Sequence, residues 1–243
     1  MNTLGNNNKH RRLAALAYSA GRVCLALAFA LGLAGGVVQA APSAATAPGL
    51  GSAASFAVLA NAAVTCTDGT ITGDVGTFLP TPTGSVTQTN CPITGTVHVG
   101  DAAAIQAYNN FLSMYAALAP QPGDVCPIIT GTLAGQNLAP GVYCVSAEAK
   151  TGVLTLTGPA NGTWTFKVAP GAFTGTSFSV VMAGGGQACN VKWWVAQGAT
   201  ITDSHLIGTI LAGAAITLTR GTFNGNAWSR ADVTITGTAV TGC

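Results

Sequence analysis

The sequence predicts a mostly β protein in which strands stack into a solenoid, accompanied by one long helix. Charged residues make up only 7% of the 243 residues, whereas Gly and Thr each occur 32 times, a composition typical of turn-rich β structure. One segment has the periodicity of a helix, and the last third of the chain repeats every 17 residues. The low charge excludes a nucleic-acid-binding protein, which needs clustered Lys and Arg to neutralise phosphates.

Residues 1–40 have the pattern of a secretory signal peptide. A basic start at Lys9–Arg12 precedes an apolar stretch that is densest from Val23 to Val38, and Val38-Gln39-Ala40 predicts cleavage after Ala40. The alternative is a retained membrane anchor, but Arg22 and several glycines interrupt the apolar segment. Cleavage leaves five basic and seven acidic side chains, a formal charge of −2. We expect an extracellular, periplasmic or cell-surface protein without a membrane segment, with a flexible leader at residues 41–49.

The cysteines indicate disulfides. Six remain after residue 40, and an even number is typical of an exported, disulfide-bonded chain. The preferred pairs are Cys66–Cys91 and Cys126–Cys144, because each would close a loop rich in Pro, Gly or Asn, a constraint that stabilises by ~3 kcal/mol. Cys189–Cys243 is the pair that remains. The absence of a Cys-x-x-Cys pair argues against zinc.

Residues 101–118 predict the helix. Apolar side chains recur from Ala104 to Leu118 with the i, i+3, i+4, i+7 spacing of an amphipathic helix. Asp101 is a suitable N-cap, and Pro120 and Pro122 end the segment. Strand-like runs separated by Gly lie before this helix, and from Gly141 onward the pattern is β throughout.

The C-terminal third aligns with itself at a shift of 17 residues. Trp194 aligns with Leu211 and Trp228, and Leu206 aligns with Phe223 and Val240. A fixed period of this kind indicates stacked coils. Three Thr-x-Thr segments share the same register, and their central residues are Ile201, Leu218 and Ile235.

These segments predict a grid of hydroxyl groups. If the three central apolar residues point inward, strand alternation turns the flanking threonines outward. The spacing would be ~4.8 Å between coils and ~6.7 Å within a strand. The six residues are Thr200, Thr202, Thr217, Thr219, Thr234 and Thr236. Threonine is also a favoured strand residue, so an ordinary β surface explains these columns equally well. A second candidate surface is the column Ser204, Gly221 and Thr238, together with Thr222.

Catalytic and metal chemistry is not expected. Asp203-Ser204-His205 contains the residue types of a catalytic triad, but neighbours in a strand alternate between faces and cannot line up. His98 and His205 are the only histidines after the predicted cleavage site, too few for a metal site. We therefore expect a non-enzymatic protein with no cofactor and no metal.

Six segments, in order along residues 50–240, carry a resemblance to a known family. They are Leu50–Ala60, Ile71–Gly76, Gly100–Ala104, Leu138–Cys144, Ala188–Trp193 and Gly208–Ala212. These segments resemble the secreted ice-binding, or antifreeze, proteins of microbes. The resemblance implies that residues 50–243 form a discontinuous right-handed, three-sided β-solenoid. In such a fold the N-terminal strands join the coil formed by the C-terminal strands, and the helix packs along one side.

The function implied by the resemblance is adsorption to ice, with inhibition of ice recrystallisation as part of cold adaptation. The expected partner is the ice surface, and the expected state is a monomer. Because the ice-binding face of the family is irregular, the resemblance does not choose between the two candidate surfaces. The alternative is an extracellular adhesion or structural solenoid without ice activity. An exposed aromatic patch would favour it, and one of the adjacent Trp193 and Trp194 is expected to face outward.

Overall fold

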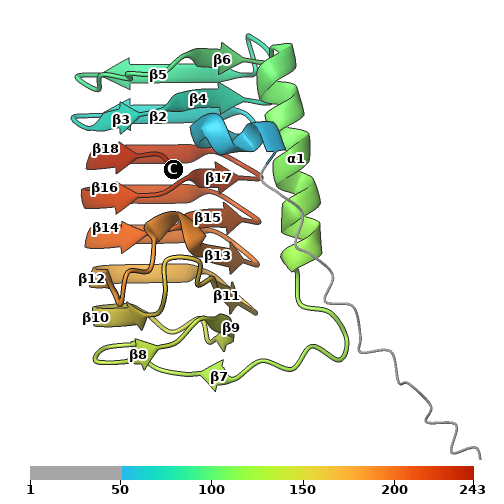
Figure 1. Cartoon of the computed structure of the whole chain (residues 1–243). Helices are drawn as coiled ribbons and strands as arrows, with labels where there is room; N and C mark the ends of the chain where they lie inside the picture. The colour runs from blue at the N-terminus through green and yellow to red at the C-terminus, as the bar shows by residue number, and fades with distance from the viewer. Residues whose placement is uncertain (1–50) are drawn as a thin grey trace, which may run out of the picture. The chain divides into compact units, whose positions relative to one another are not determined.

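The computed structural model describes residues 51–243, and the predicted signal peptide and leader lie outside the described residues. The described chain is mostly β with one α-helix, as the sequence predicts (Figure 1). Strands form two parallel sheets. The first sheet contains, in spatial order, β6 (Val97–Val99), β4 (Asp74–Thr77), β1 (Phe56–Ala60), β17 (Ala227–Ser229), β15 (Thr209–Ala212), β13 (Val191–Val195), β11 (Trp164–Val168), β9 (Gly141–Val145) and β7 (Ile128–Ile129).

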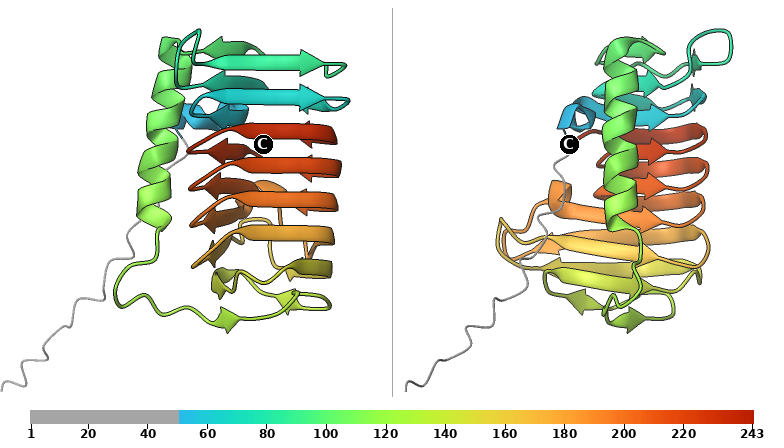
Figure 2. Two further views of the ribbon diagram at one scale, coloured as in Figure 1. Left: turned by 180° about the vertical axis from the view of Figure 1, so that it is seen from behind. Right: turned by 90° about the vertical axis from the view of Figure 1, so that its right-hand side faces the viewer.

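The second sheet lies beside the first and contains the longest strands. Its order is β5 (Ser85–Thr89), β2 (Ala63–Thr67), β18 (Val233–Thr241), β16 (Ile216–Asn224), β14 (Ala199–Ile207), β12 (Phe173–Ala183), β10 (Lys150–Thr157) and β8 (Asn137–Leu138), with β3 (Thr70–Thr72) also paired to β18. The helical elements are η1 (Gly51–Ser55), α1 (Ala102–Leu118) and η2 (Ala188–Asn190). Strands of the two sheets alternate along most of the chain, so the chain winds from one sheet to the other as the coils stack (Figure 2).

The stack is discontinuous in sequence. The C-terminal strands β17 and β18 pair with the N-terminal strands β1 and β2, for example at Leu59 with Trp228 and at Cys66 with Ile235. Figure 1 shows the N-terminal coils directly beside the C-terminal ones. Both ends of the described chain therefore meet inside the stack, nearer to the end formed by β5 and β6.

Each long strand of the second sheet is divided by one residue with a left-handed backbone. The φ angles of these residues lie between 48° and 73°, and the residues are Gly152, Ser177, Asp203, Arg220 and Gly237. Alternation breaks at this point: Thr202 and the exposed Asp203 both face outward, and Ser204 is buried. Each of these strands therefore has a first segment before the left-handed residue and a second segment after it.

The interior follows the predicted register. Ile201, Leu218 and Ile235 are 4%, 1% and 0% exposed, which confirms that they point inward. The 17-residue alignment is also the strand pairing, with Leu206 opposite Phe223 and Phe223 opposite Val240. The interior is therefore a continuous apolar column through the stacked coils.

Replacing Leu218 by Ala should lower the free energy of unfolding by ~2–5 kcal/mol, because the substitution leaves a cavity between neighbouring coils. Chemical denaturation of the two proteins measures the difference. Asn224→Ala, at an exposed position of the same strand, should change the free energy by less than ~0.5 kcal/mol. Equal effects of the two substitutions would contradict the inward placement of Leu218.

The helix covers the outer side of the first sheet. As predicted, the side chain of Asp101 caps it by accepting a hydrogen bond of 2.9 Å from the amide of Ala104. Its buried face packs on outward side chains of the first sheet, which include Leu59, Leu211 and Trp228. Ile105, part of the predicted apolar stripe, is 37% exposed.

The helix also explains why no exposed tryptophan is found. Trp193 points into the stack and is 0% exposed, whereas Trp194 points outward but is only 6% exposed. The ring of Trp194 stacks on Tyr115 of α1 at 5.1 Å, and its Nε1 donates to the carbonyl of Tyr115 at 2.8 Å. Trp194 therefore points outward as expected, but the helix covers it, so these two tryptophans form no exposed aromatic patch.

The three disulfides join the expected cysteines. The Cα atoms are 5.8 Å apart in Cys66–Cys91 and 5.5 Å apart in both Cys126–Cys144 and Cys189–Cys243. Thiol titration of the unfolded, unreduced protein beginning after Ala40 should therefore detect no free thiol. Detection of several thiols would contradict this pairing.

Two further expectations concern membranes and metals. Within residues 51–243, no helix is both long and apolar enough to cross a bilayer. Among the same residues, no group of three or more His, Cys, Asp or Glu side chains is placed to hold a metal ion.

Candidate functional site

The predicted threonine grid occupies the first segments of the second sheet and is twice as large as the 17-residue register indicates. Strand pairing places six rows of Thr-x-Thr in register, on β5, β2, β18, β16, β14 and β12. We call this surface the threonine face. One column is Thr87, Thr65, Thr234, Thr217, Thr200 and Thr174, and the other is Thr89, Thr67, Thr236, Thr219, Thr202 and Thr176.

All twelve side chains reach solvent, since each is exposed or only half-buried. In four of the rows the residue between the two columns points inward and is buried, and these residues are Cys66, Ile235, Leu218 and Ile201. In the outermost row, on β5, the corresponding Gln88 is exposed. Every neighbouring pair of rows is joined by parallel strand pairing. A packed interior and continuous backbone hydrogen bonding make this a rigid and regular surface.

Sequence reasoning missed half of the face because its outer rows do not follow the period of 17. Thr65 and Thr87 are 22 positions apart, and Thr174 and Thr200 are 26 apart. A search for Thr-x-Thr alone would have found the missing rows. It would also have returned Thr70-Ile71-Thr72, which pairs with the second segment of β18. Only the strand pairing distinguishes the rows of the threonine face from additional Thr-x-Thr segments such as this one.

The second candidate surface is wrong, because its column lies inside the protein. Ser204 and Thr238 are 2% and 3% exposed. Ser204 Oγ donates to the carbonyl of Thr202 at 2.7 Å and accepts from the amide of Phe178 at 3.1 Å. Thr238 Oγ1 donates to the carbonyl of Thr236 at 3.3 Å. The left-handed residue just before this column resets the alternation and turns the column inward.

Thr222 remains exposed, but it lies on the second segment of β16 rather than on the threonine face. Its Oγ1 is 2.8 Å from Nδ1 of His205 on the neighbouring strand. The exposed Asp203 and His205 flank the buried Ser204, so these three side chains do not form a catalytic line.

Charged groups lie at one border of the threonine face. Arg220 forms a bidentate pair with Asp203, with Nε–Oδ1 at 2.6 Å and Nη2–Oδ2 at 2.8 Å. The hydrogen bond from the guanidinium holds the pKa of Asp203 below its ordinary value, so the carboxylate stays ionised at neutral pH. Nearer β5, Asn90 Nδ2 donates to Asp68 Oδ1 at 2.9 Å. The two columns themselves contain only neutral side chains.

A regular array of short, neutral side chains on a rigid sheet suits adsorption to an ordered surface better than enclosure of a small ligand. The described chain is thus a parallel β stack with a regular, neutral threonine surface. Residues 58–241 match the family described as ice-binding-like, and the chain belongs to this family.

Individual relatives agree with this membership. The chain is 30% identical to an ice-binding protein of Flavobacterium frigoris (strain PS1), over 79% of this chain and 75% of that protein. It is 34% identical to an ice-binding protein of Nostoc sp. (strain HG1), over 71% of this chain and 64% of that protein. The crystal structure of an ice-binding protein from the Antarctic ascomycete Antarctomyces psychrotrophicus superimposes with a TM-score of 0.72 at 33% identity. That superposition covers 81% of this chain and 98% of the other.

Proposed function

We propose that this protein binds ice through the threonine face and thereby inhibits ice growth and recrystallisation. The observation that carries the proposal is the register of twelve threonines in two columns across six neighbouring strands. Ice is a rigid lattice of water, so a rigid lattice of side chains can meet it at many points at once. Family membership and the relatives named above support the same function.

Threonine suits this role for three physical reasons. Its methyl group gains ~0.8 kcal/mol per buried carbon on leaving liquid water. Its hydroxyl group can hold a water molecule at a fixed position. Its β-branched side chain has few rotamers, so little entropy is lost when the surface docks. Each contact is weak, but the sum over twelve residues makes release slow. Ice between bound molecules then grows as curved fronts, which lowers the local freezing point.

We also infer that the stack is a right-handed, three-sided solenoid. The first sheet would form one side, and the first and second segments of the second sheet would form the other two. The left-handed residues from Gly152 to Gly237 support a corner between these segments. A right-handed winding is the hand that parallel strand connections almost always adopt.

The proposal includes action outside the cell as a monomer, without enzymatic activity or a cofactor. The signal-peptide pattern of residues 1–40 and three disulfides support export. The face needs no second subunit to be complete, since all six rows come from one chain.

An ice-recrystallisation assay on residues 41–243 tests the proposal. Small ice grains should keep their size in the presence of the folded protein and coarsen normally after it has been reduced and unfolded. Partition of the protein into a slowly grown ice hemisphere provides an independent measurement. A folded protein that neither slows coarsening nor enters the ice would favour the structural or adhesion alternative.

A further inference from the structure

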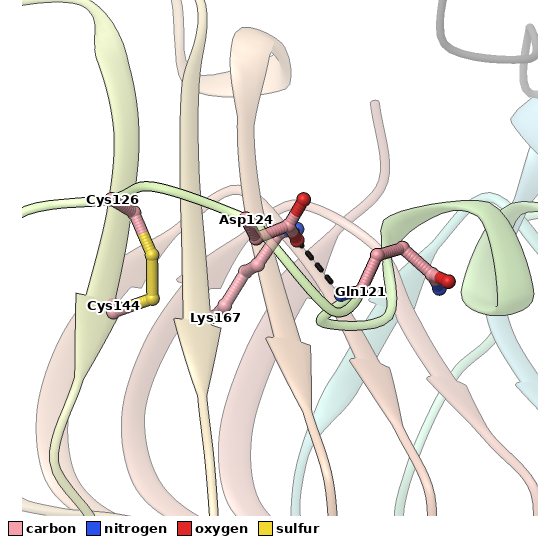
Figure 3. Close-up of a disulfide and its surroundings, with 5 residues drawn as sticks. All are labelled: Gln121, Asp124, Cys126, Cys144 and Lys167. Carbon is pink, nitrogen blue, oxygen red and sulfur yellow. Dashed lines mark hydrogen bonds and ion pairs between the residues drawn. A yellow bond between two sulfur atoms is a disulfide. The ribbon is translucent and has the colours of Figure 1, made fainter. Parts of the chain in front are cut away.

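The outer side of the first sheet is not covered by α1 along its whole length. The helix ends at Leu118, and residues 119–127 continue past β11 and β9 as an irregular segment that leads to β7. We call this segment the strap (Figure 3). The Cys126–Cys144 disulfide fixes its far end to β9. A cavity of about 490 Å³ lies beside the strap.

The walls of this cavity are mainly apolar. Its apolar lining comes from the strap and β7 and from the ends of β9 and β11 with the turns that follow them. The residues are Pro120, Ile128, Val145, Ala147, Ala169 and Pro170. The volume is within the range of small-molecule sites, ~300–1,000 Å³, and the pocket is open to solvent at Ile128, which is 77% exposed. A cavity of this kind favours a ligand whose larger part is a hydrocarbon.

One charged side chain lines the same cavity. Lys167 leaves β11 toward the strap, and its side chain is only 11% exposed. Its Nζ donates to Asp124 Oδ2 at 2.5 Å (Figure 3). An ammonium group has three donors, and this is the single hydrogen bond that Nζ makes within residues 51–243. Two of its donors therefore have no partner among these residues.

Asp124, which accepts the hydrogen bond from Lys167, does not itself line this cavity. It lines a neighbouring space on the other side of Lys167, together with Val125 and Thr165. The amide of Gln121 also donates to Asp124 Oδ2 at 2.9 Å and ties the carboxylate to the strap. The hydrogen bond from Lys167 lowers the pKa of Asp124, so the ammonium is paired with an ionised carboxylate, while the Lys167 side chain lines both pockets.

We propose that this cavity binds an aliphatic carboxylate. The oxygens of the ligand would accept hydrogen bonds from Lys167 Nζ, and its hydrocarbon chain would pack against the apolar walls. The positive charge disfavours a cationic amphiphile. The scarcity of polar groups in the lining disfavours a sugar, which needs several hydrogen-bond partners. The cavity belongs to the first sheet, whereas the threonine face belongs to the second, so the two sites act independently.

The test is a calorimetric titration of the folded, disulfide-bonded protein with decanoate, below the concentration at which decanoate forms micelles. The expected result is saturable binding of one decanoate per protein. Lys167→Met keeps most of the apolar stem and removes the donors, and it should weaken binding at least about tenfold, which corresponds to ~1.4 kcal/mol. Ala147→Trp should abolish binding by filling the cavity.

Matched controls distinguish binding at this site from non-specific binding of decanoate. Lys192→Met changes a half-buried lysine on the neighbouring strand β13, outside the cavity lining, and should leave decanoate binding unchanged. Asp124→Asn removes the competing carboxylate and should strengthen binding, which gives a second test if Lys167→Met does not fold. Absence of saturable binding overturns the proposal, as does equal binding of decanol or of decyltrimethylammonium. Inhibition of ice growth should be the same in all these variants, so the test does not depend on the ice-binding result.

Discussion

Thr219→Tyr should abolish the inhibition of ice growth while the protein remains folded. Thr219 lies in one of the two central rows of the threonine face, with Thr236 and Thr202 as its neighbours in the column. If ice binds this face as proposed, a tyrosine ring would rise above the flat surface, and the residues around it would lose contact with the ice as well. Thermal hysteresis and grain coarsening measure the activity, and the melting temperature reports on folding. Substitutions of this kind at the surface usually change stability by less than ~0.5 kcal/mol.

Thr222→Tyr is the matched control, since it makes the same change on the same strand but beyond Arg220. It should keep full activity. If Thr222→Tyr abolishes activity and Thr219→Tyr keeps it, ice binds the second segments rather than the threonine face. Family membership would stand in that case, and the chosen surface would be wrong.

Trp228→Ala should lower the free energy of unfolding by ~3–5 kcal/mol, the largest effect expected for a single substitution here. Trp228 is 0% exposed and lies where three parts of the chain meet. It pairs with Leu59 of β1, its Nε1 donates to the carbonyl of Phe56 at 2.8 Å, and its ring lies 6.2 Å from that of Phe111 in α1. The substitution would therefore leave a large cavity and an unpaired carbonyl between the N-terminal coil and the helix.

Denaturant unfolding measures this effect, and hydrogen exchange locates it. Exchange should speed up most in β1 and α1, the elements that Trp228 joins. Trp228→Phe keeps much of the volume and loses only the hydrogen bond, so its cost should be smaller, about 1 kcal/mol. If Trp228→Ala lowered the free energy of unfolding by less than about 1 kcal/mol, the junction between the N-terminal coil and the helix would not depend on this side chain.

Structural features that depend on residues close together in the chain could be predicted from the sequence. The Asp101 cap, the end of the helix before Pro120 and the inward side of each Thr-x-Thr segment all follow from local periodicity. The 17-residue repeat predicts the pairing of β14, β16 and β18 because each of these coils has the same length. The preferred disulfides also agree with the structure, since short loops favour their closure.

The errors arise where distant segments meet or where the backbone departs from ordinary strand geometry. Arg220 adopts a left-handed φ of 55°, which nothing in its residue type indicates. Gly237 has a left-handed φ of 60° at the same place on β18, so strict strand alternation puts Thr238 on the wrong side of its strand. Trp194 is covered by a helix about eighty positions earlier, and the rows at Thr65 and Thr87 join the face only through β18. No local pattern reports such contacts.

The meeting of β18 with β2 also determines when the protein can be completed during its synthesis. The ribosome delivers β1 and β2 long before their partners β17 and β18, which follow α1 and most of the other strands. Until then one edge of each early strand has unpaired amide and carbonyl groups, which are prone to association with other chains. Folding of the N-terminal coils must therefore wait until β17 and β18 have emerged. Pairing across so long a separation in sequence is characteristic of slow folding.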